Sequence, residues 1–124
     1  IGVIPGAGAA MRLTRWMGRL KAKEILMLGD FVPGPEAVQC GLANRCVPGA
    51  ELAQVTAAWA AKLAKKAPLA LAAAKSCVNV GAEAAMPVAL EYELREFLLL
   101  FESEDQKEGM TAFLEKREAN FTGR

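Results

Sequence analysis

The sequence offers few residue types for acid–base chemistry, because its 124 residues include no histidine. This absence excludes Ser–His and Cys–His nucleophile pairs and histidine metal sites. A general acid or base would have to be Glu, Asp, Lys, Tyr or Cys. Carboxylates gather on two expected helices; they are Glu91, Glu93, Glu96, Glu102, Glu104, Asp105 and Glu108. Those of the second helix suit the positive end of a helix dipole, so we assign no catalytic pair.

The three cysteines are Cys40, Cys46 and Cys77. An odd number without a pairing motif predicts reduced thiols and an intracellular, reducing compartment. Cys40 and Cys46 lack the CxxC spacing of zinc sites, so no metal is expected. We interpret all three as small buried hydrophobic residues.

A glycine-rich turn, Pro5-Gly6-Ala7-Gly8, precedes the first helical pattern. Such turns can present backbone N–H groups to phosphates or oxyanions. The turn has no Gly-Lys-Ser/Thr, and Met11 occupies the place of the third glycine of the dinucleotide fingerprint. The spacing alone therefore favours a tight turn that leads into a helix.

Basic side chains follow this turn without an intervening acid; they are Arg12, Arg15, Arg19, Lys21 and Lys23. They could contact the phosphates of a ligand or of RNA, but a solvated helix face is the more common meaning. Trp16 is the only interleaved aromatic residue, which argues against RNA binding. The net charge of +1 gives no general attraction to nucleic acid or to anionic membranes.

The hydrophobic periodicity predicts a mainly α-helical chain. Helices are expected over residues 9–17, 20–28, 35–40, 51–66, 68–80, 87–101 and from 103 to about 118. Short extended segments are expected over residues 1–4, 30–32 and 42–47. No apolar run reaches the roughly 18 residues of a membrane span, so none is expected.

The last two helices carry specific signals. Ser103, followed three residues later by Gln106, has the spacing of a capping box. The stretch EFLLLF, residues 96–101, is apolar on all sides after its first residue. A helix without a polar face is buried in a core or against another chain. We therefore expect this chain to pack against further protein.

Four segments in order resemble motifs of the enoyl-CoA hydratase/isomerase (crotonase) superfamily. "IPGAGAAMRLTRWMG" is similar to its "IPGAGGTQRLTRxxG", and "AKEILMLGDFVPGPEAVQCGLANRCVP" resembles its "A-x-E-x-x-x-TG-x-x-x-x-A-x-E-A-x-x-x-GL-V-x-x-V-x-P" region. "APLALAAAKSCVN" resembles "P-x-A-x-x-x-x-K-x-x-x-N", and "FESEDQKEGMTAFLEKREANF" resembles "F-x-T-x-D-x-x-EGM-x-AF-x-EKR-x-x-x-F". The resemblance covers essentially the whole chain and implies the C-terminal portion of a subunit.

This resemblance implies a fold and an activity. The family's α/β subunit is a spiral of ββα turns followed by a helical region used in trimer assembly. Residues 1–48 would be the end of the spiral core, and residues 49–124 the helical assembly region. Family members hydrate, isomerise or cleave acyl-CoA thioesters, with two glutamates and an oxyanion hole of two backbone N–H groups. They use no cofactor, since coenzyme A is part of the substrate.

The resemblance assigns only peripheral roles to this chain. The catalytic glutamates and the oxyanion donors correspond to positions before Ile1. Lys116 matches a position near the CoA adenine and phosphates, and Phe113 and Phe97 match positions near the CoA or acyl chain. The alternatives are a solvated lysine and two helical core residues. The remaining matched positions, Pro5, Gly6 and Gly8, would support the active-site wall by shape.

One departure keeps two functions open. Relatives often carry Gly-Gly-Thr-Gln where this chain has Gly8, Ala9, Ala10 and Met11, so polar groups beside the acyl pocket are lost. The chain is thus expected to be part of an enoyl-CoA hydratase of acyl-CoA metabolism, or a catalytically inactive structural subunit of a larger complex. Acyl-CoA and crotonase-like chains are the expected partners. The mitochondrial matrix is the favoured compartment, with the cytoplasm as the alternative.

Overall fold

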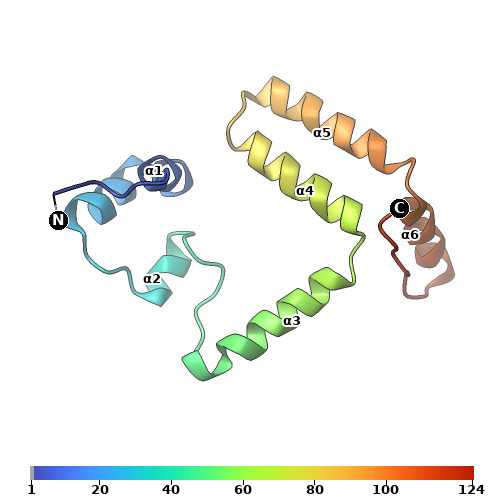
Figure 1. The fold of residues 1–124 in the computed structure, drawn as a ribbon, viewed down its shortest axis with the longest axis horizontal. Coiled ribbons are helices and arrows are strands. Elements are labelled where there is room, and N and C mark those ends of the chain that lie inside the picture. The colour runs from blue at the N-terminus through green and yellow to red at the C-terminus, as the bar shows by residue number, and fades with distance from the viewer. Residues whose placement is uncertain (1) are drawn as a thin grey trace. The chain divides into compact units, whose positions relative to one another are not determined.

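A computed structural model describes residues 2–124 of the chain. Within this range the regular structure is helical and no β-strand forms. The elements, in chain order, are α1 (Ala9–Leu28), α2 (Gly34–Gln39), the short 3-10 helix η1 (Gly49–Glu51), α3 (Leu52–Ala64), α4 (Pro68–Gly81), α5 (Met86–Leu100) and α6 (Glu104–Glu115) (Figure 1). The predicted mainly α-helical chain is therefore confirmed.

The expected extended segments do not pair into a sheet. Residues 30–32 and 42–47 carry no strand assignment, and neither do residues 2–4, while Ile1 lies outside the described residues. A strand needs a neighbouring strand to satisfy its backbone groups, and no such neighbour lies in the described part of the chain. The structure separates into two compact units, one ending at Leu52 and one beginning at Ala53. The expected boundary between the spiral core (residues 1–48) and the helical assembly region (residues 49–124) concerns the complete subunit and stays a prediction.

A kink at Gly18 divides α1 in the first unit. Gly18 has φ 78° and ψ 169°, which is extended backbone with a positive φ. A left-handed cap, which glycine often forms at a helix end, is absent here because the ψ of Gly18 lies far from the left-handed helical value. Only glycine adopts this conformation readily. The two helices predicted on either side of Gly18 are present, and Gly29, with φ 72°, ends the second of them.

An ion-pair cluster connects α1 to α2. The ammonium group of Lys21 bonds the carboxylates of Glu24 and Glu36. Both carboxylates raise the pKa of Lys21. Ala22 and Ala37 are buried in these helices. Lys21 therefore serves packing within the first unit, and the basic segment is not simply a solvated face.

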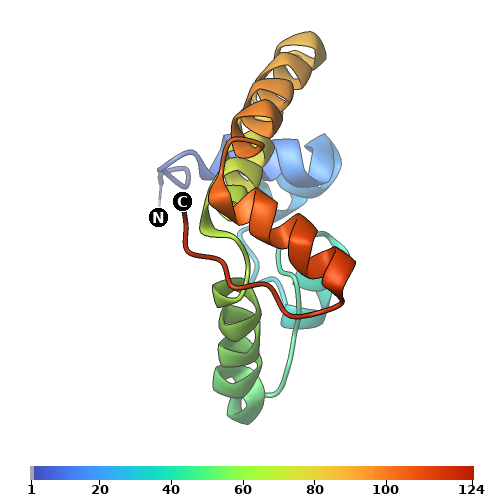
Figure 2. The same cartoon turned by 90° about the vertical axis from the view of Figure 1, so that its right-hand side faces the viewer.

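In the second unit, α4 and α5 lie side by side and antiparallel, as two views at right angles show (Figures 1 and 2). Ala73 is buried in α4, and the Ser76 hydroxyl bonds the Tyr92 hydroxyl of α5 at 2.6 Å. Gly81, just beyond the expected range 68–80, is the last residue of α4. The N–H of Ala82 still bonds the Val78 carbonyl at 3.1 Å, so the right-handed pattern continues through Gly81.

Helix α6 begins where the capping signal predicted. The Ser103 hydroxyl accepts a hydrogen bond from the Gln106 N–H at 3.1 Å. The helix ends at Glu115 and not near residue 118, because Lys116 is left-handed, with φ 55° and ψ 39°. Arg117 and the residues after it then run back along α6.

Small side chains form the interior of the described residues. Among residues 2–124, the buried apolar residues are Ala22, Ala37, Ala73 and Ala112, and the one buried charged residue is Asp105. Large apolar side chains lie outside; the most exposed include Phe31, Leu20, Ile4 and Phe113. The chain therefore leaves most of its large apolar surface uncovered, as the apolar stretch of α5 predicted.

Candidate functional site

Two hydrogen bonds connect the glycine-rich turn to the start of α1. Ala7 and Gly8 both have positive φ, 54° and 79°. The Gly6 carbonyl accepts the Ala9 N–H at 3.1 Å, and the Ala7 carbonyl accepts a hydrogen bond from the Arg12 guanidinium at 3.1 Å. The turn is thus fixed from both the backbone and a side chain. The backbone of such a turn can form part of a pocket wall. The predicted role of Pro5, Gly6 and Gly8 in the active-site wall remains a prediction.

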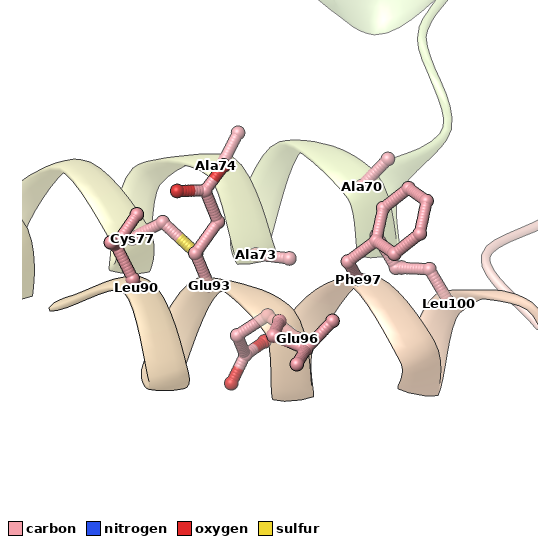
Figure 3. A pocket seen from close by; sticks show the side chains of 10 residues that line it. Ala70, Ala73, Ala74, Cys77, Leu90, Glu93, Glu96, Phe97 and Leu100 are labelled. Atoms are coloured by element: carbon pink, nitrogen blue, oxygen red, sulfur yellow. The ribbon is translucent and has the colours of Figure 1, made fainter. Parts of the chain in front are cut away.

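An apolar groove runs between α4 and α5 (Figure 3). Its volume is about 440 Å³, and it is lined by alanine, leucine and phenylalanine side chains with the carboxylates of Glu93 and Glu96 among them. Phe97 lies in this groove and packs edge-to-face on Phe101, with ring centroids 5.0 Å apart. Phe97 is still 55% exposed, so the described residues do not make it a core residue. The groove can accept an apolar group or further protein.

Cys77 also lines this groove. Desolvation, followed by the nearby Glu96 and Glu93 carboxylates, raises the pKa of the Cys77 thiol. A raised pKa lowers the thiolate fraction and makes this thiol a poor nucleophile. All three cysteines are free; Cys40 and Cys77 are half-buried and Cys46 is exposed, so the expectation that all three are buried is wrong. Cys46 lies in a connecting loop, and its sulfur lies 2.6 Å from where a Cβ at Gly34 would be.

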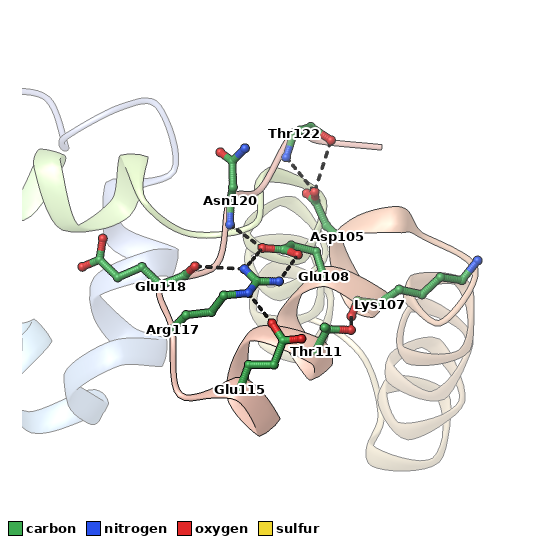
Figure 4. A network of polar contacts seen from close by, with 9 residues as sticks. All are labelled: Asp105, Lys107, Glu108, Thr111, Glu115, Arg117, Glu118, Asn120 and Thr122. Atoms are coloured by element: carbon green, nitrogen blue, oxygen red, sulfur yellow. Dashed lines mark hydrogen bonds and ion pairs between the residues drawn. The ribbon is translucent and has the colours of Figure 1, made fainter.

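A C-terminal clasp, which we define as Asp105, Glu108, Arg117, Asn120, Thr122 and Gly123, ties the last residues to α6 (Figure 4). The carboxylate of Asp105 accepts the N–H groups of Thr122 at 2.7 Å and of Gly123 at 2.9 Å. The Asp105 N–H in turn donates to the Arg124 carbonyl at 3.0 Å. Asp105 is only 3% exposed, so this carboxylate is fully used in holding the tail.

Glu108 forms the second half of the clasp. Its two oxygens face the two terminal nitrogens of Arg117 at 2.7 and 2.8 Å, in the paired geometry that suits a guanidinium. One oxygen also accepts the Asn120 N–H at 2.8 Å. The hydrogen bonds from Arg117 and then from Asn120 lower the pKa of Glu108 to about 2. Arg117 also bonds Glu115 at 2.6 Å, so the start of the tail is anchored to α6 twice.

Lys116 occupies the turn between α6 and the clasp. Its N–H donates to the Phe113 carbonyl at 3.3 Å, and the Arg117 N–H donates to the Ala112 carbonyl at 3.0 Å. These two bonds form a Schellman motif, in which the left-handed position is usually glycine. Phe113, on the last turn of α6, is 80% exposed. The structure therefore brings Lys116 and Phe113 to one helix end and places Phe97 in the α4/α5 groove.

The sequence interpretation missed the clasp. Asp105 and Glu108 were interpreted as dipole-stabilising acids, but they bind the tail. Gly109 belongs to the same arrangement, because a Cβ at this position would lie 3.3 Å from the Phe121 ring. The missed signal is the spacing of Asp105 and Glu108 on one helix face, followed by a donor-rich segment that begins at Arg117.

Comparisons with known proteins identify relatives of the whole chain. The family model described as enoyl-CoA hydratase/isomerase matches residues 1–124. The mitochondrial enoyl-CoA hydratase of Pongo abelii is 40% identical over 98% of this chain and 42% of its own length. The crotonyl-CoA hydratase of Syntrophomonas wolfei is also 40% identical, over 98% of this chain and 46% of its own length.

Solved structures agree with these relatives. Enoyl-CoA hydratase subunit I of Geobacillus kaustophilus superposes with a TM-score of 0.95 at 43% identity, over 99% of this chain and 48% of that one. An enoyl-CoA hydratase from Bacillus anthracis gives a TM-score of 0.95 at 32% identity and similar coverage. The chain thus spans about half the length of the proteins that it matches, which agrees with the predicted C-terminal portion. No described helix is long and apolar enough to cross a membrane.

Proposed function

Since the chain belongs to the enoyl-CoA hydratase/isomerase family, we propose that it serves as the C-terminal part of an enoyl-CoA hydratase that adds water to trans-2-enoyl-CoA. The observation that supports this most strongly is the 40% identity, over nearly the whole chain, to proteins named enoyl-CoA hydratase and crotonyl-CoA hydratase. In this function the chain binds substrate and builds the assembly. The catalytic glutamates and the oxyanion donors come from the part of the subunit that precedes the matched segment.

The ammonium group of Lys116 is proposed to meet the phosphates of the CoA nucleotide. Lys116 is exposed and lies at the end of α6, where its ammonium group can contact a ligand from solvent. Phe113 offers an exposed ring next to it for the CoA or acyl chain. Phe97, in the α4/α5 groove, and the turn with Pro5, Gly6 and Gly8 are proposed to shape the acyl-binding wall.

Assembly is proposed to follow from the uncovered apolar surface. Leu98 and Leu99 on α5 and Phe101, which caps its C-terminal end, are 57%, 64% and 50% exposed. We propose that the remainder of the subunit and neighbouring crotonase-like subunits cover them in a trimer or a dimer of trimers. Relatives include a mitochondrial and a bacterial hydratase, and we propose a reducing compartment, the mitochondrial matrix in the first place.

A chimera tests this function. The matching segment of Geobacillus kaustophilus enoyl-CoA hydratase subunit I is replaced by this chain, and crotonyl-CoA hydration is followed by the loss of enoyl absorbance. We expect hydration within about tenfold of the parent enzyme, because the catalytic groups are unchanged. A folded, assembled chimera without activity would contradict the proposal and support the alternative, a structural subunit without catalysis. The departure at these positions can then be tested by the substitutions Ala9→Gly, Ala10→Thr and Met11→Gln.

A further inference from the structure

Lys116 has a backbone conformation that does not suit a lysine. Its φ of 55° and ψ of 39° are left-handed, and the Schellman motif around it favours glycine. In this region a Cβ crowds the following carbonyl oxygen, so residues other than glycine are strained. Non-glycine residues persist in such conformations where the surrounding structure holds them, and they concentrate at functional sites. The left-handed conformation of Lys116 therefore needs an explanation besides the ending of α6.

The residue that follows Lys116 is fixed in two ways. The Arg117 N–H bonds the Ala112 carbonyl, and its guanidinium is held by both oxygens of Glu108 and by Glu115. Glu108 lies two helical turns before Lys116, so its contact with Arg117 spans the turn that contains Lys116. Asn120 adds a backbone bond to the same carboxylate. The chain on the C-terminal side of Lys116 is thus pinned to the helix on its N-terminal side.

We propose that Glu108 and Arg117 are positioning residues for acyl-CoA: their paired contact holds the Lys116 turn left-handed and so fixes where the Lys116 ammonium meets the CoA phosphates. This inference rests on the proposed role of Lys116 in the function above. Neither residue touches the ligand in this proposal. Both act through the backbone geometry at Lys116.

Electrostatics alone predicts the opposite effect from the proposal. Glu108 is a carboxylate near a site that binds an anion, so replacing it with a neutral residue should strengthen binding of the CoA phosphates. The proposal predicts weaker binding, because the turn loses the contact that holds Lys116. The direction of the change in KM therefore separates a positioning role from a general charge effect.

The test uses the assembled chimera with the whole of this chain. Glu108→Gln is expected to raise the KM for crotonyl-CoA about two- to fivefold, the loss expected for one exposed ion pair, with kcat almost unchanged. Arg117→Lys should behave in the same way, because an ammonium cannot bond both carboxylate oxygens. Glu108→Asp, which keeps the charge, should restore part of the affinity. Glu118→Gln is the matched control: it removes an exposed carboxylate two residues from Lys116 and should not raise KM.

A double-mutant cycle gives the sharpest readout. Lys116→Gly removes the ammonium and favours the left-handed backbone, and it should raise KM about as much as Glu108→Gln. In the Lys116→Gly background, Glu108→Gln should then change KM no further, because it acts only through Lys116.

Four outcomes would overturn the inference. An additive effect of the two changes, or an unchanged or lower KM in Glu108→Gln, would do so while leaving the proposed function intact. Failure of both Glu108→Gln and Arg117→Lys to assemble would assign the pair to the fold as a whole. An unchanged KM in Lys116→Gly would remove the role of Lys116, whereas loss of hydration in the unsubstituted chimera would contradict the proposed function itself.

Discussion

Replacing Asp105 with asparagine should release the C-terminal clasp. The Asp105 carboxylate is 3% exposed and accepts two backbone N–H groups, from Thr122 at 2.7 Å and from Gly123 at 2.9 Å. Asparagine keeps one acceptor oxygen, but its NH₂ group then faces the other N–H donor. One charge-assisted hydrogen bond is lost and one donor is left without an acceptor. The remaining hydrogen bond then has a neutral amide oxygen as its acceptor in place of a charged carboxylate oxygen.

The magnitude follows from these contacts. A hydrogen bond to a charged group contributes about 1.5–3 kcal/mol, and a buried donor without a partner costs about 1–3 kcal/mol. The tail can detach and regain water, which limits the total to about 2–4 kcal/mol of the free energy that keeps the clasp closed. The amides of Thr122 and Gly123 should therefore exchange with deuterium about 30- to 1,000-fold faster. The acceleration cannot exceed the protection factor that these amides have in the unsubstituted protein.

Hydrogen exchange of the chimera, resolved to single amides, measures this change. Glu104→Gln is the matched control, since Glu104 also lies in the first turn of α6 but is exposed. In the control, these two amides should keep their protection. Equal exchange in Asp105→Asn and in the unsubstituted chimera would refute the assigned role of the carboxylate. Equal acceleration in both variants would show that the helix dipole, and not the clasp, holds the tail.

Three further predictions concern the clasp, the thiols and the isolated chain. Because contacts in the fold lower the pKa of Glu108 to about 2 from an ordinary value of 4.5, its contribution should be complete above about pH 4.5 and lost as the pH falls toward about 2. Exchange of the Asn120 amide should report that loss, and Glu108→Gln should remove the dependence on pH. Thiol titration under denaturing, non-reducing conditions should count three free thiols, whereas a count of one would reveal a disulfide. The isolated chain should not hydrate crotonyl-CoA, because it contributes none of the expected catalytic groups; a rate well above buffer would contradict this.

Local signals in the sequence predicted the helices well. The hydrophobic periodicity and the Ser103 capping signal act within a few residues of where they stand, so their effects need no distant partner. Gly18 shows what local signals do not predict. A glycine between two helical patterns indicates a positive φ, but the packing of its neighbours decides its ψ. The left-handed Lys116 could not be predicted, because lysine has no preference for that conformation and the contact that supports it comes from Glu108.

The candidate site was less predictable than the fold. Lys116, Phe113 and Phe97 came from the family resemblance, and no periodicity or spacing singles them out. Asp105 and Glu108 carry an ordinary helix-start pattern, and only the return of the tail reveals their role. A pattern read along one helix does not show which later segment folds back on it.

The central claim is that this chain is one part of a crotonase-type subunit whose apolar helices need further protein to cover them. Sedimentation of the purified isolated chain at micromolar concentration tests it most directly. The buried apolar residues of the described chain are alanines, while Leu98, Leu99 and Phe101 stay half exposed or more. Each large side chain left in water forgoes about 1.5–3 kcal/mol. We predict association into oligomers or aggregates, and a well-folded monomer with a cooperative unfolding transition would contradict the account.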